Sequence, residues 1–416
     1  MNSLKRKIKR CNLLVVGASG GVANAFLHHL CDYRNLFNKL ILVDKNDCLL
    51  NDKYVNHQML NYSFIHKKIV LPEKEKEYLS LLKKYKVQIV LDLTDMDSTA
   101  ILEATNKAKV SYVNTALNDR IKSADELVFN IIKKKDQING APHIICSGMN
   151  PGVVNMWVRY GIEKYGVPTQ IIHFEYDTSK LAKKWHPLVT WSIHEFLTEA
   201  IKDPSGLALG KNKIKKLLPN ALENRKDMKS ILSPIMKLDK YPSGLTVLHE
   251  ENISLSYLYN IPSKFIYAIN QQTMDNLIKL YKKNKNVRKK DLVLGDNTSE
   301  VLSGEDNIGV ILEYSDKLVY YFNTFPNVAV IGTNATYTQV IIGVFSALFT
   351  LLIDNLPPKV YFVEDLFDTH YKYFLFDNLR VQEFVFNNSG SRPVLQYYNP
   401  MVKIRRRDRF EHMYLI

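Results

Sequence analysis

The sequence is poor in the residues that form covalent or metal cross-links. Only four of its 416 residues are cysteines, and they form neither a CxxC pair nor the histidine spacing of a zinc site. They are Cys11, Cys31, Cys48 and Cys146. We therefore expect reduced thiols in a reducing compartment, and no metal ion.

Long hydrophobic runs are also missing. The longest, "VIIGVFSALFTLLI" at 340–353, is shorter than a membrane span and is typical of a buried helix. The apolar residues after the basic start, "CNLLVV", are too few for a signal peptide. These absences predict a soluble cytoplasmic protein without a membrane partner.

Acidic residues are fewer than basic ones. The chain has 42 Asp and Glu against 56 Lys and Arg, a formal net charge of +14. Two basic runs, 279–290 and 403–410, carry part of this surplus. We interpret them as solvated faces first and as contacts to a polyanion second, and nucleic acid is not an expected partner.

Strand and helix patterns alternate over the first third of the chain. The apolar strand segments are 12–19, 39–46, 87–95, 110–116 and 142–148, and the helix segments between them are 21–32, 98–109 and 124–135. Such alternation favours a parallel sheet with crossover helices. We therefore predict an α/β protein whose first domain, 1–155, is Rossmann-like.

The pattern changes after about residue 155. Strands are expected at 169–179 and 263–270, a helix at 192–203, and a hairpin at 307–325 that turns near Ser315 and Asp316. We predict a second α+β domain with an antiparallel sheet at 156–330, for substrate binding and dimerisation. The apolar helix within 331–358 is expected to return to the Rossmann domain, and the tail 359–416 to pack on the core.

The segment "VVGASGGVANAF" indicates a nucleotide site, because its glycine turn lies between a strand and a helix and lets a pyrophosphate approach the backbone. The turn residues expected at the dinucleotide are Gly17, Ser19, Gly20, Gly21 and Val22.

Asp44 ends the next strand, where a carboxylate accepts both ribose hydroxyls and repels a 2′-phosphate, which favours NAD over NADP. The alternative interpretation is that no nucleotide binds here. The glycine turn would then belong to another kind of α/β fold, and Asp44 would be a solvated residue at the end of a strand.

Polar residues at the ends of later strands extend this predicted crevice. Thr94 and Asp95 close one strand, and Thr115 closes the next. The segment around Thr94 is also typical of a helix start, with Asp97 or Ser98 as the cap, and the two interpretations are compatible.

The segment "NPG" combines an amide with a helix start. Asn150 and Pro151 suit the N-cap and first position of a helix, and they also place an amide beside a nicotinamide or a substrate amine.

Five ordered motifs resemble those of the bacterial homospermidine synthases, in the saccharopine-dehydrogenase-like superfamily. They are "DLTDMDSTAILEATNKAKVSYVNTA", "CSGMNPGVVNMWV", "IHFEYDTSKLAKK…VTWSIHEFLTEA", "SGEDNIGVIL" and "NATYTQV". The second, for example, is similar to the family's "CGANPGMVSWFV". The resemblance extends over most of the chain.

The resemblance implies an aminoalkyl transferase with bound NAD that oxidises putrescine to an imine, exchanges ammonia for a second amine and reduces the product. No net redox change occurs. It implies catalytic roles for Glu175, Glu199 and Asn150, and amine binding by Trp191 and Asp306. The expected assembly is a homodimer.

Structural roles compete with these assignments. Ser192 and Glu195 form a capping box, and Trp191 with Phe196 forms a hydrophobic staple. Glu199 alone would be a surface acid on a helix, and Asp306 a turn residue before a strand.

The chain also departs from the family. "LALGKNKIKK" lacks the family's aromatic, histidine and glutamate, and Asn270 replaces a histidine. Two alternatives therefore stay open. One is a dehydrogenase acting on a C–N bond, as in saccharopine or carboxyspermidine metabolism, with Lys183, Lys184 or Lys211 binding a carboxylate. The other is a non-catalytic nucleotide-binding protein that contacts polyanions.

Overall fold

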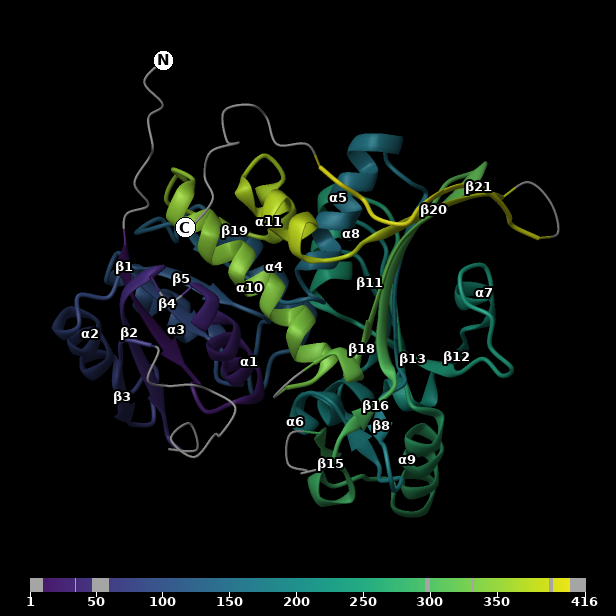
Figure 1. The fold of residues 1–416 in the computed structure, drawn as a ribbon, viewed down its shortest axis with the longest axis horizontal. Coiled ribbons are helices and arrows are strands. Elements are labelled where there is room, and N and C mark those ends of the chain that lie inside the picture. Colours follow the sequence, from purple (N-terminus) through teal and green to yellow (C-terminus); the bar gives the residue numbers. More distant parts are fainter. Residues whose placement is uncertain are drawn as a thin grey trace.

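The computed structural model describes residues 10–33, 35–46, 60–295, 300–330, 333–388 and 392–404. Two sheets dominate the molecule, and the long helix α10 (Ala335–Ile353) runs between them (Figure 1). Cys11, Cys31 and Cys146 are free thiols, whereas Cys48, most of the basic run 403–410 and the last residues of the tail lie outside the described residues.

The first sheet is parallel throughout, as the alternating pattern predicts. Within the described residues its order is β19 (Val360–Tyr361), β6 (His143–Ile144), β5 (Ser111–Asn114), β4 (Ile89–Asp92), β1 (Cys11–Val16), β2 (Phe37–Asp44) and β3 (Tyr62–His66). The chain reverses its direction of strand addition at β1 and β4. In such sheets a ligand binds at the carboxyl ends of the strands where this reversal occurs.

Helices cover both faces of this sheet, and apolar side chains of the strands alternate between two cores. The helices along this part are α1 (Gly21–Leu30), α2 (Glu75–Lys84), α3 (Ser98–Lys107), α4 (Ala124–Lys134) and α5 (Val153–Tyr165). Phe26 of α1 packs on Phe345 of α10, with ring centroids 5.1 Å apart. The burial of these large side chains on both faces makes the sheet a rigid base for the loops at its edge.

The second sheet has ten strands among the described residues. Eight of them follow the order β11 (Ile214–Leu218), β10 (Ser205–Ala208), β14 (Ser263–Ile269), β7 (Gln170–Asp177), β17 (Glu305–Glu313), β18 (Lys317–Pro326), β20 (Gln382–Asn387) and β21 (Val394–Asn399). The other two are β12 (Arg225–Asp227) and β13 (Ser243–Val247), and β13 also pairs with β14. Short pairs form between β15 (Val293–Leu294) and β9 (Leu188–Val189), and between β16 (Leu302–Ser303) and β8 (Lys180–Leu181).

The expected antiparallel character of this sheet is only partly correct. The hairpin β17–β18 turns at the expected Ser315 and Asp316, but β7 and β14 are parallel, so the sheet is mixed. A chain of about 85 residues separates these two strands, so their direction is set by tertiary packing and not by a local turn.

The remaining helices are α6 (Ile193–Leu197), α7 (Lys229–Leu232), α8 (Glu250–Tyr259), α9 (Gln271–Asn284) and α11 (His370–Asn378). The helix expected over 192–203 divides into α6 and a turn of π-helix, Thr198–Lys202. Such π segments widen a helix locally and often occur at functional sites.

Helix α10 is long and apolar enough to cross a membrane by length and composition, but 72% of its apolar window is buried inside the protein. After it the chain contributes β19 to the first sheet and then β20 and β21 to the second. The C-terminal segment therefore ties both sheets together.

Candidate active site between the two sheets

The glycine turn after β1 has the backbone that a bound pyrophosphate requires. Gly17 has a φ of +81°, and a Cβ there would lie 2.7 Å from the backbone oxygen of Leu93. Gly20 is the N-cap of α1 without a side-chain hydrogen bond, and Gly21 and Val22 form the first helical turn. The turn therefore presents free helix N–H groups to an anion, and its residues fit a dinucleotide.

Asp44 closes the side of this turn. Its Oδ2 accepts a hydrogen bond from the backbone N–H of Ser19 (3.0 Å), and its Oδ1 accepts one from Asn46 N–H (2.9 Å). The carboxylate is only partly buried. It thus fixes the glycine turn and keeps a negative charge at the place where the ribose of a dinucleotide would lie.

The loop after β4 is fixed by a buried acid. Asp92 Oδ1 accepts hydrogen bonds from the Thr94 hydroxyl (2.7 Å) and N–H (3.1 Å), and Oδ2 accepts one from Tyr112 (2.8 Å). Burial raises the pKa of Asp92 to about 6, against these stabilising bonds. The predicted cap is confirmed as Asp97, whose Oδ1 accepts from the first turn of α3.

The predicted cofactor residues converge at one edge of the first sheet. Gly17 follows β1, Asp44 ends β2, Thr94 follows β4, Thr115 follows β5 and Asn150 follows β6. Asp95 is exposed beside Thr94, and Pro151 forms a cis peptide with Asn150. These residues therefore lie at the carboxyl ends of five neighbouring parallel strands, the edge at which the nucleotide crevice is predicted.

Asn150 does not cap a helix, contrary to one of the two interpretations of its motif. The N-cap of α5 is Gly152, so helix α5 begins at Val153. The side-chain amide of Asn150 instead donates from Nδ2 to Oε2 of Glu175 at 2.5 Å. This bond joins the nucleotide edge of the first sheet to strand β7 of the second.

Three carboxyl groups share the inner face of the second sheet. Glu175 and Asp177 are two residues apart on β7, and Asp306 of β17 pairs directly with Asp177. Because side chains alternate along a strand, all three point to the same side. Their exposed fractions are 4%, 4% and 0%, and Oδ1 of Asp306 has no hydrogen-bond partner within the described residues.

Burial controls the charge of this carboxylate row (Glu175, Asp177 and Asp306). Burial, followed by Asp306, raises the pKa of Glu175 well above its usual range, against the hydrogen bond from Asn150. Burial and then Asp177 likewise raise the pKa of Asp306, while Thr336 donates to its Oδ2 at 2.8 Å. The raised pKa values of Glu175 and Asp306 favour their protonated forms, and a cation that enters the row would stabilise the ionised forms.

Trp191 forms one wall near this row. Its Nε1 donates to the hydroxyl of Tyr267 at 3.0 Å, and Tyr267 pairs in register with Glu175. The predicted staple is also present, because the rings of Trp191 and Phe196 lie 6.2 Å apart at 90°, and Ser192 caps α6 by accepting from Glu195 N–H. Trp191 is therefore held by a structural contact while part of its surface stays accessible.

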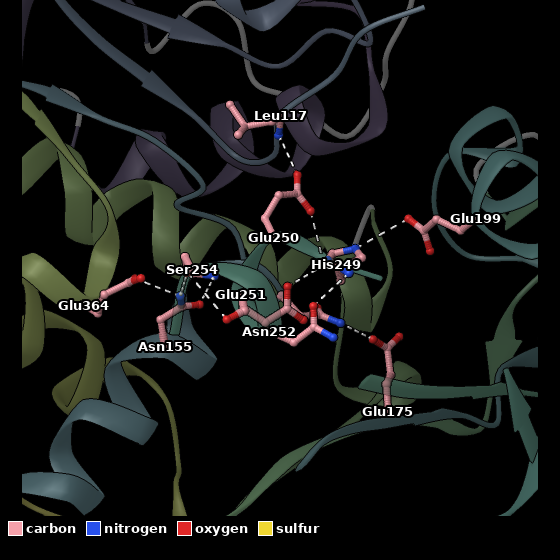
Figure 2. A network of polar contacts seen from close by, with 12 residues as sticks. Leu117, Asn155, Glu175, Glu199, His249, Glu250, Glu251, Asn252, Ser254 and Glu364 are labelled. Atoms are coloured by element: carbon pink, nitrogen blue, oxygen red, sulfur yellow. Dashed lines mark hydrogen bonds and ion pairs between the residues drawn. The ribbon is translucent and has the colours of Figure 1, made fainter. Parts of the chain in front are cut away.

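Glu199, on the π-helix, faces a histidine that the sequence argument does not identify. His249 precedes α8, and its Nε2 lies 3.5 Å from Oε1 of Glu199. Its Nδ1 lies 2.5 Å from Glu251 and 3.4 Å from Glu250. Figure 2 shows this His249 cluster (His249, Glu199, Glu250 and Glu251), with the carboxylates around the ring.

The ring of His249 is expected to be charged. Burial alone would lower its pKa, but Glu251, Glu250 and Glu199 outweigh burial and raise the pKa well above its usual range. The same pairing lowers the pKa of Glu251 in spite of burial. His249, Glu250 and Glu251 also bring three buried ligand atoms within 4.8 Å of one another, but a protonated imidazole cannot coordinate a metal ion, so this cluster is an ion-pair network.

Other residues of the site were accessible to sequence reasoning only in part. His173 lies two residues before Glu175 and Asp177 two residues after it. Because alternate side chains of a strand point to the same side, both lie on the same face of β7 as Glu175. Burial lowers the pKa of His173 to about 4. Tyr267 lacked such a signal, because its contact with Trp191 depends on the pairing of β7 with β14.

Acidic groups continue toward solvent. Burial, then Glu199 and Asp95, raises the pKa of Glu195 to about 7, and burial and Glu199 raise that of Asp203 to about 6.

The basic side chains named for a carboxylate substrate lie elsewhere. Lys183 and Lys184 are exposed, and their backbone N–H groups donate to half-buried Glu300. Lys211 is exposed, and its backbone N–H donates to the side chain of Asn260.

Comparison with known proteins gives a family match in the first part of the chain. Residues 13–142 match the family described as saccharopine dehydrogenase NADP binding domain. None of the curated proteins matches the chain in sequence. The fold is similar to that of saccharopine dehydrogenase (L-Glu forming) from Saccharomyces cerevisiae, with 11% identity, a TM-score of 0.58, and coverage of 90% of this chain and 99% of that chain.

Two other solved structures show a weaker likeness. Myo-inositol 2-dehydrogenase from Lactobacillus plantarum has 9% identity and a TM-score of 0.36, covering 75% of this chain and 76% of that chain. Aspartate semialdehyde dehydrogenase II from Vibrio cholerae has 10% identity and a TM-score of 0.29, covering 73% and 72%. The family match supports a nicotinamide dinucleotide as the ligand of the first domain, and the chain has the fold of saccharopine dehydrogenase.

Proposed function

We propose that the protein is an NAD-dependent enzyme that oxidises an amine at its C–N bond, condenses the imine with a second amine and reduces the product. The activity proposed is similar to that of homospermidine synthase, with putrescine as the first substrate. The observation that carries the proposal is the hydrogen bond that joins Asn150, at the nucleotide edge, to Glu175 of the buried carboxylate row.

The charge of the pocket favours a cationic substrate. The charges that act most strongly on Glu175 are those of Asp306, Asp177 and Glu199, all of them acidic. A substrate carboxylate placed there would be repelled, whereas an ammonium group would replace the protons that the row holds. A diamine meets this requirement, because one nitrogen reacts while the other stays charged.

The row also supplies a base. An amine must lose its proton before it can lose a hydride or attack an imine. Glu175 can take up that proton once a substrate ammonium group has stabilised its ionised form, and the amide of Asn150 holds the carboxyl group in place. A nicotinamide bound beside Asn150 would accept the hydride and return it.

Trp191 and Asp306 are proposed to hold the remote ammonium group. An ammonium over the face of a tryptophan gains about 0.5–2 kcal/mol, or roughly a three- to thirty-fold preference over a neutral competitor. Asp306 has a free buried oxygen that a cation would satisfy. Glu199 and the His249 ring provide a second proton-transfer pair for the incoming amine.

The experiment follows the fate of labelled putrescine. The protein is incubated with NAD and labelled putrescine, and the products are separated while free NADH is recorded. We expect a labelled triamine with no net NADH. A protein that binds NAD and never yields a triamine would show that the condensing activity is wrong.

A dehydrogenase acting on an amine–acid conjugate is the second candidate, and the match to saccharopine dehydrogenase favours it. It requires a basic side chain for the carboxylate, and Lys183, Lys184 and Lys211 are exposed, whereas the row is buried. Net consumption of a nicotinamide cofactor with such a conjugate would establish it. A nucleotide-binding protein without turnover would instead bind polyanions with a steep salt dependence.

We further propose a cytoplasmic homodimer, an assembly that rests on the resemblance to homospermidine synthases. Sedimentation of the purified protein over a range of concentrations tests it. A single species with the mass of one chain, 48.1 kDa, would contradict the dimer.

A further inference from the structure

One buried side chain contacts both halves of the site described above. Glu250 is the first residue of α8, and its exposed fraction is 4%. Its Oε1 accepts a hydrogen bond from the backbone N–H of Leu117 at 2.7 Å, although the two residues are far apart in sequence. Its Oε2 lies 3.4 Å from Nδ1 of His249. Figure 2 shows Glu250 between Leu117 and His249.

The Leu117 end belongs to the nucleotide crevice. The loop 115–118 follows β5 and begins with Thr115, one of the residues expected at the dinucleotide. Asn118 ties this loop to its neighbour: its N–H donates to the Ser98 hydroxyl (2.9 Å) and its Nδ2 to the backbone oxygen of Thr94 (3.2 Å). A displacement of Leu117 would therefore move both loops that border the crevice.

The His249 end belongs to the amine pocket. The titratable groups nearest to His249 are Glu199 of the π-helix, Glu250 and Glu251 of α8, and His173 of β7. Its carboxylate partners are in turn coupled to Glu195, Asp203, Glu175 and Cys146. Burial raises the pKa of Glu250, while a charged His249 and the Leu117 N–H favour its ionised form, and an ionised carboxylate is the stronger acceptor for that N–H. Loss of the imidazolium proton would weaken this bond.

We propose that Glu250 is a positioning residue that couples the 115–118 loop of the nucleotide crevice to His249 of the amine pocket. The proton on His249 thereby affects how firmly the crevice is held, and bound nucleotide in turn favours the protonated ring. This inference rests on the proposed function, since it joins the two sites that the function uses. Glu250 is not required to touch either substrate.

Two substitutions separate the parts of this link. Glu250→Gln keeps an oxygen for the Leu117 N–H and removes the charge beside His249. Glu250→Ala removes both. Glu364→Gln is the matched control. Glu364 is also a buried carboxyl group near α8, and it accepts a hydrogen bond from Asn155. Figure 2 draws no contact between Glu364 and either Leu117 or His249.

The measurements need no turnover. NAD affinity is measured by calorimetry between pH 6 and 9, and the titration of the His249 ring by NMR, with His249→Gln assigning the signal. We expect Glu250→Ala to weaken NAD binding about tenfold, as for loss of a charge-assisted bond. Glu250→Gln should keep the affinity at pH 6 within about twofold while the His249 pKa falls. Glu364→Gln should change neither.

Each outcome decides between claims. Unchanged NAD affinity in Glu250→Ala would overturn the link while leaving the proposed function intact. An unchanged His249 titration in Glu250→Gln would overturn the electrostatic part of the link. A wild-type protein without affinity for NAD would overturn both the link and the proposed function. Circular dichroism and thermal unfolding confirm that each variant is folded before binding is measured.

Discussion

The amide of Asn150 donates a 2.5 Å hydrogen bond to Glu175, and this contact spans the boundary between the two sheets. Asn150 follows the sixth strand of the parallel sheet, where a nicotinamide is expected, and Glu175 lies in the middle of a buried acidic face. We propose that this contact places a redox coenzyme and a proton acceptor on either side of one substrate position. The following predictions test the separate parts of this arrangement.

Removing the carboxyl group of Glu175 should abolish most of the activity. In Glu175→Gln the hydrogen bond with Asn150 can persist, but no base remains to take the proton from the amine. General base catalysis contributes about 100- to 10,000-fold, and we expect kcat to fall by that order while NAD binding is kept. Steady-state triamine formation measures it. Glu163→Gln, a change at an exposed partner of Arg159, is the control and should retain wild-type rates.

The carboxylate of Asp44 should select NAD over NADP. Asp44→Asn keeps an acceptor for one of the two backbone N–H groups and removes the charge that would face a 2′-phosphate. We expect the preference for NAD over NADP to drop about tenfold, since the repelled charge is partly exposed and screened. Titration of both nucleotides measures the ratio. Equal affinity of the wild-type protein for both would show that Asp44 has no such role.

Trp191 should contribute to amine affinity more than to stability. Trp191→Phe keeps an aromatic ring for the staple with Phe196 and loses both the better cation–π partner and the bond to Tyr267. We expect KM for the amine to rise roughly three- to thirty-fold, with a small change in Tm. Trp185→Phe is the matched control, because Trp185 is 37% exposed. A KM equal to that of wild type would assign Trp191 to the staple alone.

The buried acid Glu364 should make stability fall as pH rises. Burial, followed by Asp365, raises its pKa to about 7, whereas in the unfolded chain it ionises near 4.3. Between these values the unfolded state releases a proton that the folded state keeps, so the folded state is increasingly disfavoured at higher pH. Full folded-state stability is therefore present below the unfolded pKa.

Glu364→Gln removes this titration and leaves a neutral group that resembles the protonated acid. The free energy of unfolding of the variant should gain about 2 kcal/mol on wild type between pH 5.5 and pH 8.5. Urea unfolding at the two pH values measures the difference. A difference that does not change with pH would mean that Glu364 is ionised in the folded protein throughout this range.

Local sequence patterns were sufficient to predict those parts of the fold that depend on contacts between residues close in sequence. The glycine turn at Gly17, the cap at Asp97 and the hairpin turn at Ser315 involve neighbours in the chain, and all three are present. The parallel pairing of β7 with β14 was missed, because residues distant in sequence decide it.

The site divides in the same way. Glu175 was identified with its family motif, and strand period then places Asp177 beside it. His249 was missed although "HEE" begins a helix directly after a strand, a position where ionisable side chains gather at one edge. Asn150 fits an N-cap by sequence, yet the N-cap of α5 is Gly152. Gly152 has a φ of +134°, and a Cβ at this position would lie too close to neighbouring backbone atoms.

The central claim is that one pocket holds an amine against a coenzyme that takes a hydride and returns it. The most direct measurement uses putrescine fully deuterated at its two terminal carbons, with NAD and a second amine, and mass spectrometry of the triamine. Because the hydride returns to the carbon that lost it, we predict that the product keeps two deuterium atoms at the new C–N carbon. A product with one deuterium there, or deuterium accumulating in free reduced coenzyme without triamine, would contradict the account.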